Sequence, residues 1–190
     1  MSRSLIEEKW NSITHSIMFG FFVGYLIRAD KPLRLFCFGL AITMLFSSLY
    51  HAVEEKRRKN NLRKLDMMSI HVTIMTTGAA YVMAYGQAFF IYLVLLVGFL
   101  GIYYIQANYG TKGFEGRVSM SFVLFGLATA VLATLSIVLS GNSYNLISFV
   151  LGIIFYLTGL VFYVKDVRKW YHTVWHLFVI GGSLVHLNGL

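Results

Sequence analysis

The sequence predicts an all-α membrane protein, a bundle of seven transmembrane helices that forms a single domain over residues 1–190. Of the 190 residues, 57% are hydrophobic and only 13% are charged, which is far from the composition of an average soluble domain. A helix needs about 20 apolar residues to cross a hydrocarbon core of about 30 Å. Such runs occur at 10–28, 34–53, 65–85, 87–107, 118–140, 144–163 and 170–189. They leave no room for a soluble domain.

The seven runs differ in how apolar they are. The first follows two acids and has no small-residue cleavage site after it, so we expect it to stay in the membrane as a helix. The second contains the lone Cys37, which we expect to pack as a small hydrophobe. The third is the weakest, because Asp66, His71 and several threonines interrupt it. Short connections such as 140–145 favour a compact helical bundle.

Basic residues are concentrated on one face of the predicted bundle. Thirteen of the 16 Lys and Arg residues lie in the N-terminus and in the connections after the second, fourth and sixth runs, and the other three are Arg28, Lys31 and Arg34. By the positive-inside rule, the N-terminus is cytoplasmic and the C-terminus is outside, as in a multi-pass protein of the cell membrane. We expect the basic stretch 56–64 to be a loop that anchors this topology and contacts anionic lipid. Because the charges are confined to connections, the net charge of +8 does not indicate a partner among nucleic acids.

Polar residues gather at the cytoplasmic ends of four predicted helices. The second run ends at His51, and the third begins near Asp66. The seventh begins with His172 and His176, which lie four residues apart and therefore on one helical face. The first run begins beside Glu8, Asn11, Thr14 and His15. Burying an ionisable group in a bilayer costs on the order of 2.5 to 3.5 kcal/mol, so these groups need a compensating partner.

Zinc is the natural partner for such a cluster. It binds neutral imidazole nitrogens, and three protein ligands plus a water make a catalytic site with an open position. The sequence therefore predicts a zinc ion held by His51, His172 and His176. We expect Asp66 to hydrogen-bond the bound water. Ser47, four residues before His51 on the same face, is expected to line the pocket.

Structural interpretations of these histidines stay open at this point. A single histidine in a helix bundle is more often a satisfied core residue than a ligand. The pair His172 and His176 has no Glu after the first histidine, so it is not the metalloprotease motif HExxH. His15 could simply hydrogen-bond Asn11 or Glu8 and hold the first helix.

Two further histidines are expected to lie away from the pocket. His71 is five residues from Asp66, about 140° around the helix, and should face elsewhere. His186 is about 15 Å from His176 along the seventh helix and cannot share its site. We expect a structural role for His186.

Three blocks of polar residues follow one another along the chain. They are ExxNxxTH at 8–15, SSLYH followed by KLD at 47–66, and HxxxHxxxxxxxxxH at 172–186. In combination they resemble the hemolysin III family, the bacterial branch of the progestin and adipoQ receptor superfamily. The chain departs from the family pattern after KLD, where it has no proline. This difference concerns the cavity beside the site and therefore the substrate.

The resemblance implies a seven-helix bundle with a cytoplasmic N-terminus and a zinc ion near the inner leaflet. His51, His172 and His176 match the positions that bind the zinc. Asp66 and Ser47 match the positions that contact the zinc-bound water or line its pocket.

The resemblance also implies ceramidase-like chemistry, the hydrolysis of a lipid amide or ester with a membrane lipid as substrate. In this hypothesis zinc polarises the carbonyl and supplies hydroxide, while Asp66 accepts or orients the proton and Ser47 stabilises the oxyanion.

Three alternatives are compatible with the same residues. One is a non-enzymatic sensor in membrane or lipid homeostasis, whose zinc fastens the second, third and seventh helices. Another is the pore formation that the family name suggests, but a secreted pore former needs a water-soluble form, and this chain would then expose several apolar helices. The third is proton transport through histidine and aspartate residues, although no internal inverted repeat favours it.

Overall fold

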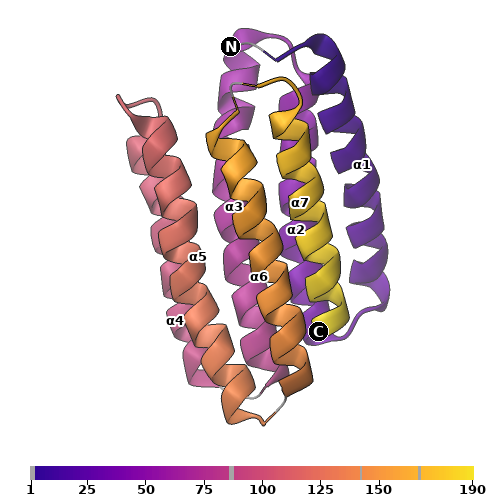
Figure 1. Ribbon diagram of the computed structural model, residues 1–190, viewed down its shortest axis with the longest axis vertical. Coiled ribbons are helices and arrows are strands. Elements are labelled where there is room, and N and C mark those ends of the chain that lie inside the picture. Colours follow the sequence, from indigo (N-terminus) through magenta and orange to yellow (C-terminus); the bar gives the residue numbers. More distant parts are fainter. Residues whose placement is uncertain (1–2, 86–87, 142, 167) are drawn as a thin grey trace.

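The computed structural model describes residues 3–85, 88–141, 143–166 and 168–190. Figure 1 shows seven helices over these ranges, and no strand occurs in them. The helices are α1 (Leu5–Arg28), α2 (Lys31–Ala52), α3 (Lys56–Ala84), α4 (Ala88–Asn108), α5 (Phe114–Leu139), α6 (Ser143–Val164) and α7 (Tyr171–Gly189). Each helix contains one predicted apolar run to within two residues, apart from the start of the fourth at Gln87, which lies outside the described residues. The prediction of an all-helical fold is confirmed.

Local sequence determines where the first two helices begin and end. Ser4 caps α1 and forms a capping box with Glu7, in which each side chain accepts a hydrogen bond from the other residue's backbone. Asp30 caps α2, and Pro32 lies in its first turn, where a missing N–H costs nothing. Only Ala29 and Asp30 separate the two helices, so they pack as antiparallel neighbours.

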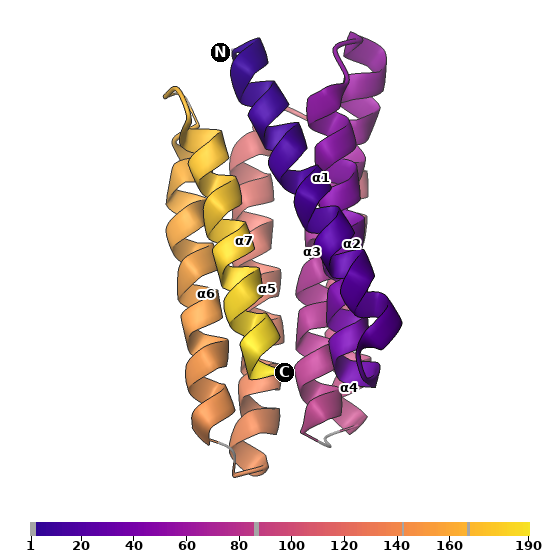
Figure 2. The same cartoon turned by 90° about the vertical axis from the view of Figure 1, so that its right-hand side faces the viewer.

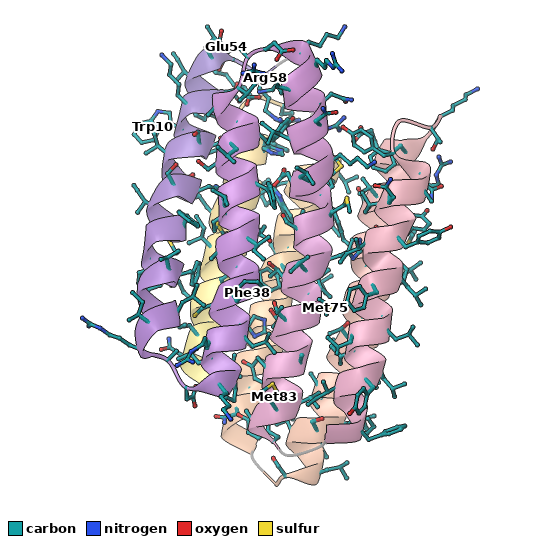
Figure 3. The ribbon with its side chains drawn as sticks, turned by 180° about the vertical axis from the view of Figure 1, so that it is seen from behind. Trp10, Phe38, Glu54, Arg58, Met75 and Met83 are labelled. Atoms are coloured by element: carbon teal, nitrogen blue, oxygen red, sulfur yellow. The ribbon has the colours of Figure 1, made fainter. Side chains whose placement is uncertain are left out.

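The prediction of a basic loop at 56–64 is wrong, because these residues form the first turns of α3. Lys, Arg and Asn are all tolerated in helices, and the stretch has neither glycine nor proline. Hydropathy marks where a helix enters the membrane and not where the helix starts. Figure 3 shows Glu54 and Arg58 at this end of the bundle and Met83 near the opposite end. We call the end that contains Glu54 and Arg58 the basic end.

Six helices form a ring, and α4 packs against two of them, α3 and α5. The ring consists of α1, α2, α3, α5, α6 and α7. Along the chain, α1 packs on α2, α2 on α3, α5 on α6 and α6 on α7, while α3 also contacts both α4 and α5. Contacts between α1 and α7 close the ring. In Figure 2, α1 is inclined across the bundle, with its N-terminal end near the start of α7 and its C-terminal end beside α2. The inclination brings the first turns of α1 and α7 together at the basic end.

Among the described residues, five helices are both long enough and apolar enough to cross a membrane: α2, α3, α4, α5 and α6. Helices α1 and α7 have 24 and 19 residues, but buried polar residues lower their hydropathy. The outward faces of α4 and α5 are apolar, with Phe89 70% and Met120 57% exposed. Side chains of this kind are stable against lipid. The fold is therefore that of a multi-pass membrane protein.

Candidate metal centre

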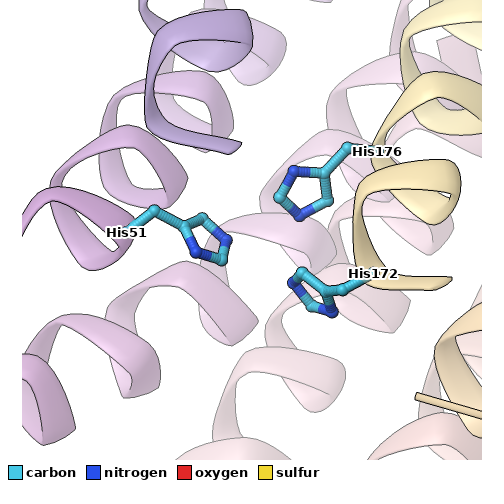
Figure 4. A group of neighbouring side chains, drawn as sticks. All are labelled: His51, His172 and His176. Carbon is cyan, nitrogen blue, oxygen red and sulfur yellow. The ribbon is translucent and has the colours of Figure 1, made fainter. Parts of the chain in front are cut away.

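Three histidines from two distant parts of the chain converge near the basic end. His51 lies in the last turn of α2, and His172 and His176 lie in the first two turns of α7. Figure 4 shows their rings directed toward one another across the space between these helices. One potential ligand nitrogen from each ring lies within 4.8 Å of the other two, and all three residues are buried. The arrangement has the size of a site for one metal ion.

Each of the three rings has a buried nitrogen with no hydrogen-bond partner among the described residues. These atoms are His51 Nε2, His172 Nε2 and His176 Nδ1. An unpaired buried nitrogen costs free energy comparable to a lost hydrogen bond, and most native proteins avoid it. A metal ion removes this cost because it takes the nitrogen lone pair as a ligand. The donor set and its unpaired atoms therefore fit a metal such as zinc.

Glu8 of α1 holds the ring of His51 from the side opposite its unpaired nitrogen. His51 Nδ1 lies 2.8 Å from Glu8 Oε2. Lys59 of α3 donates to the same carboxylate at 2.9 Å and also to the carbonyl oxygens of Tyr50 and Val53. Because a carboxylate only accepts hydrogen bonds, the proton of His51 is on Nδ1 and the lone pair is on Nε2. This tautomer suits a metal ligand.

Asp166 and Arg3 occupy the corresponding position beside His172. Asp166 Oδ2 lies 3.1 Å from His172 Nδ1, and Arg3 Nη2 lies 2.9 Å from the same nitrogen. Arg3 and Asp166 also form an ion pair at 2.5 Å. A proton on Nδ1 can be donated to Asp166, whereas a lone pair on Nδ1 can accept from Arg3. The two neighbours therefore favour opposite tautomers, and only the bond to Asp166 leaves a lone pair on Nε2.

The two carboxylates beside the histidines are ionised at neutral pH. The hydrogen bonds from His51 and Lys59 and the positive charge of Lys59 stabilise the carboxylate form of Glu8. Burial opposes ionisation of Asp166, yet the neighbouring histidine and arginine hold its pKa below its ordinary value. Each carboxylate therefore acts as a hydrogen-bond acceptor.

His15 of α1 lies against the third histidine. The ring centroids of His15 and His176 are 4.0 Å apart, and His15 Nδ1 lies 3.2 Å from the backbone oxygen of Asn11. Of the two partners expected for His15, the structure thus shows Asn11, through its main chain. His15 is buried and lies on the wall of the cavity beside the site.

Asp66 and Ser47 line the same cavity as the three histidines. Ser47 is one turn before His51 on α2, and its side chain lies beside the carboxyl of Asp66 on α3. Asp66 is half-buried, because one side of it faces the cavity. The structure therefore brings together an acid, a hydroxyl and three imidazoles around one space.

This cavity has a volume of about 1490 Å³ and a predominantly apolar wall. It extends from the histidines at the basic end along the inside of the bundle to His186 near the end of α7. Exposed apolar residues of both α5 and α6 also line it: Met120, Leu127, Leu157 and Val164. The cavity therefore reaches the lateral surface between these helices, where lipid would lie.

His71 and His186 both lie away from the three clustered histidines, although His186 lines the far end of the cavity. His71 points toward α4 and α5, where its Nε2 lies 3.2 Å from the hydroxyl oxygen of Ser121. Its ring lies against Gly101, at which a Cβ atom would be only 2.3 Å from His71 Nδ1. His186 lies beside Tyr81, with 3.2 Å between His186 Nδ1 and the tyrosine hydroxyl. Both side chains have structural partners away from the candidate site.

Sequence reasoning missed two charged neighbours of the site. Asp166 lies in the connection between α6 and α7, and Arg3 precedes α1, so helical periodicity says nothing about either. The available signal for Asp166 was its position as the one acid in the KDVRK segment, six residues before His172. Lys59 was assigned to lipid contact, whereas the structure directs its ammonium group to Glu8.

Comparisons with known proteins agree with these features. The sequence profile of a family described as "Haemolysin-III related" matches residues 3–187. A Hemolysin-3 homolog of Bacillus subtilis (strain 168) is 28% identical over 151 residues, which cover 77% of this chain and 70% of the relative. Since the profile covers all but the last two residues of the seven helices and includes the three histidines, the chain belongs to the haemolysin-III related family.

Proposed function

We propose that this protein is a zinc-dependent hydrolase of lipid amides, ceramidase-like, in the cell membrane. The observation that carries the proposal is the convergence of His51, His172 and His176, each with a buried unpaired nitrogen, at one end of a large apolar cavity. A cavity of this kind suits a lipid, and a cluster of this kind suits a metal.

Zinc is the metal that this donor set favours. Three imidazole nitrogens without a thiolate or carboxylate ligand match the three-ligand catalytic sites, in which one position stays open. When bound, zinc supplies a Lewis acid for a carbonyl oxygen and lowers the pKa of water enough to make a nucleophile at neutral pH.

The residues of the chain would handle the protons and the geometry. Asp66 would accept the proton of the attacking water and return it to the nitrogen of the departing amine, so that amide and water become carboxylic acid and amine. Ser47, which lies beside the carboxyl of Asp66, would help to hold it in place. The oxyanion contact expected for Ser47 stays a prediction.

The cavity would admit its substrate from the bilayer. Where the cavity reaches the lateral surface between α5 and α6, it is lined by apolar side chains such as Met120 and Leu157. An acyl chain could enter there without leaving an apolar environment, while its amide moves toward the histidines.

The charge distribution supports an orientation. The first turns of α1, the first turns of α3 and the connections around 109–113 and 165–170 carry most of the basic residues, and they lie at the histidine end. By the positive-inside rule this end is cytoplasmic, and all seven helices would cross the membrane.

A structural zinc in a non-enzymatic sensor is the second candidate. It is favoured by the polar contacts that connect α1, α2 and α7 around the histidines, since a metal at their centre would fasten these helices. Turnover distinguishes the two candidates.

The test combines metal analysis with an activity assay on protein purified in detergent without chelator. Zinc is measured by mass spectrometry and hydrolysis with a short-chain ceramide, in wild type, His172→Ala, Asp66→Ala and the exposed control Glu55→Ala. The proposal predicts one zinc per chain, lost in His172→Ala and kept in Asp66→Ala, with hydrolysis abolished in both and the control unchanged. Stoichiometric zinc without hydrolysis would favour the sensor, and the absence of zinc would refute both candidates.

A further inference from the structure

One face of α1 is polar and buried, although the helix lies in a membrane protein. Glu7, Asn11 and His15 repeat every four residues, with Glu8 beside them, so they share one side of the helix. Glu7, Asn11 and His15 are 6%, 0% and 3% exposed. Polar groups buried at this depth are expensive and call for a function. The proposed hydrolysis does not use them.

Each residue of this face contacts one of the candidate ligands or the helix that holds it. Glu8 binds His51, and His15 packs on the ring of His176. Asn11 Oδ1 accepts a hydrogen bond of 2.7 Å from Thr173, which directly follows His172.

Glu7 acts on the start of α7. Its Oε1 atom accepts a hydrogen bond of 2.5 Å from the backbone N–H of Trp170. Trp170 has φ 67°, in the left-handed region that bulky residues rarely adopt. The bond helps to hold this unfavourable conformation. Trp170 is the residue before α7, which begins at Tyr171, so its conformation sets the position of His172.

We propose that this face of α1, together with Asp166, positions the three metal ligands: Glu8 and Asp166 fix the tautomers of His51 and His172, and His15 fixes the ring of His176. The inference rests on the proposed metal site and assigns positioning residues to it. Glu8 and Asp166 do not touch the metal or the substrate in this account.

A carboxylate lies beside Nδ1 of both histidines, although at His172 Arg3 competes for the same nitrogen. A histidine that binds a metal through Nε2 must carry its proton on Nδ1, and a carboxylate on Nδ1 enforces this and orients the ring. Glu8 does so at 2.8 Å for His51, and Asp166 at 3.1 Å for His172. In both cases Nε2 is the buried atom without a partner among the described residues.

Arg3 should weaken zinc binding at His172, whereas Asp166 should strengthen it. Without Asp166, the guanidinium would donate to His172 Nδ1 and move the proton to Nε2, where it blocks metal binding. Asp166→Ala should therefore weaken zinc binding strongly, and adding Arg3→Gln to it should restore part of the affinity. The same Arg3→Gln change in the wild-type background should have a smaller effect.

The experiment measures zinc affinity by chelator competition on the full-length protein in detergent, with no activity assay. The variants are Glu8→Ala, Glu8→Gln, Asp166→Ala, Arg3→Gln and Asp166→Ala with Arg3→Gln. Glu55→Ala, which removes an exposed carboxylate 54% accessible at the same end, is the control. Loss of such a supporting carboxylate typically lowers metal affinity about 10- to 100-fold. We expect that loss in Glu8→Ala, a smaller one in Glu8→Gln, which keeps an acceptor oxygen, and none in the control.

Cobalt substitution gives a second readout that a merely structural role would not change. The visible spectrum of Co²⁺ reports ligand geometry, so it should shift in Glu8→Ala and return toward wild type in Glu8→Gln. Wild-type zinc affinity in both Glu8→Ala and Asp166→Ala would overturn the inference and leave the metal site intact. A wild-type protein that binds no zinc would overturn both. If Glu8→Ala does not fold, the comparison of Glu8→Gln with the control and the Arg3 rescue decide the matter.

Discussion

The close approach of α6 to the ring of His186 permits a quantitative prediction. Gly152 of α6 faces this ring, and a Cβ atom built on it would lie 2.4 Å from His186 Nε2 and 2.6 Å from both Cδ2 and Cε1. Non-bonded carbon atoms are in optimal contact at about 3.5–4.0 Å. In Gly152→Ala the ring must therefore withdraw by about 1 Å.

Aromatic rings restrict this movement, although His186 also borders the cavity. The centroid of the His186 ring lies 5.4 Å from those of Phe149 and Tyr156 and 5.6 Å from that of Tyr81. Overpacking of this kind costs about 1–3 kcal/mol. Loss of the 3.2 Å hydrogen bond to Tyr81 adds about 1 kcal/mol, while alanine gains about 1 kcal/mol over glycine in a helix. The net destabilisation is about 1–3 kcal/mol.

The assay is thermal unfolding of the detergent-purified protein. For a chain of this size each kcal/mol changes Tm by about 2–4 °C, so Gly152→Ala should lower Tm by several degrees. Gly24→Ala is the matched control, because outside its own stretch of helix no atom in the described part of the chain lies within 4 Å of its added Cβ. It should leave Tm unchanged or raise it slightly. A Gly152→Ala protein as stable as Gly24→Ala would refute the packing of α7 on α6.

Other predictions concern the metal and the route to it. Lowering the pH should weaken zinc binding, since the ligand histidines must be neutral and the metal-free protein binds more protons; an affinity independent of pH would contradict this. Removing zinc with a chelator should lower the Tm of wild type but not of His172→Ala, because only the former gains stability from the ligand. Met120→Trp, at the border between α5 and α6, should slow hydrolysis of a long-chain ceramide several-fold with zinc content unchanged. Val131→Trp, exposed on α5 away from the cavity, should not, and an equal loss in both variants would argue against lateral entry.

The number and order of the helices could be predicted from the sequence because the outer surfaces of these helices face lipid. A membrane helix must be apolar over about 20 residues, and hydropathy detects that requirement directly. The starts of α1 and α3 could not be found in this way. Outside the membrane a helix begins at a cap such as Ser4 and extends by intrinsic propensity, so Leu5 and Lys56 precede the apolar runs.

The candidate ligands were also predictable, because the topology determines which helix ends lie on the same side of the membrane. His51 ends α2, and His172 and His176 begin α7, so an antiparallel arrangement places them together. The neighbours of these histidines depend on how α1 inclines and on how far the connection before α7 reaches. Neither follows from periodicity, which is why the contact of Asp166 with His172 emerged only from the structure.

X-ray absorption at the zinc edge, on wild-type protein purified without chelator, tests the central claim most directly. The account predicts zinc with about three imidazole nitrogens at about 2.0–2.1 Å and one further light ligand, and the loss of this signal in His176→Ala. A zinc bound by sulfur at about 2.3 Å, or protein with no zinc at all, would contradict it.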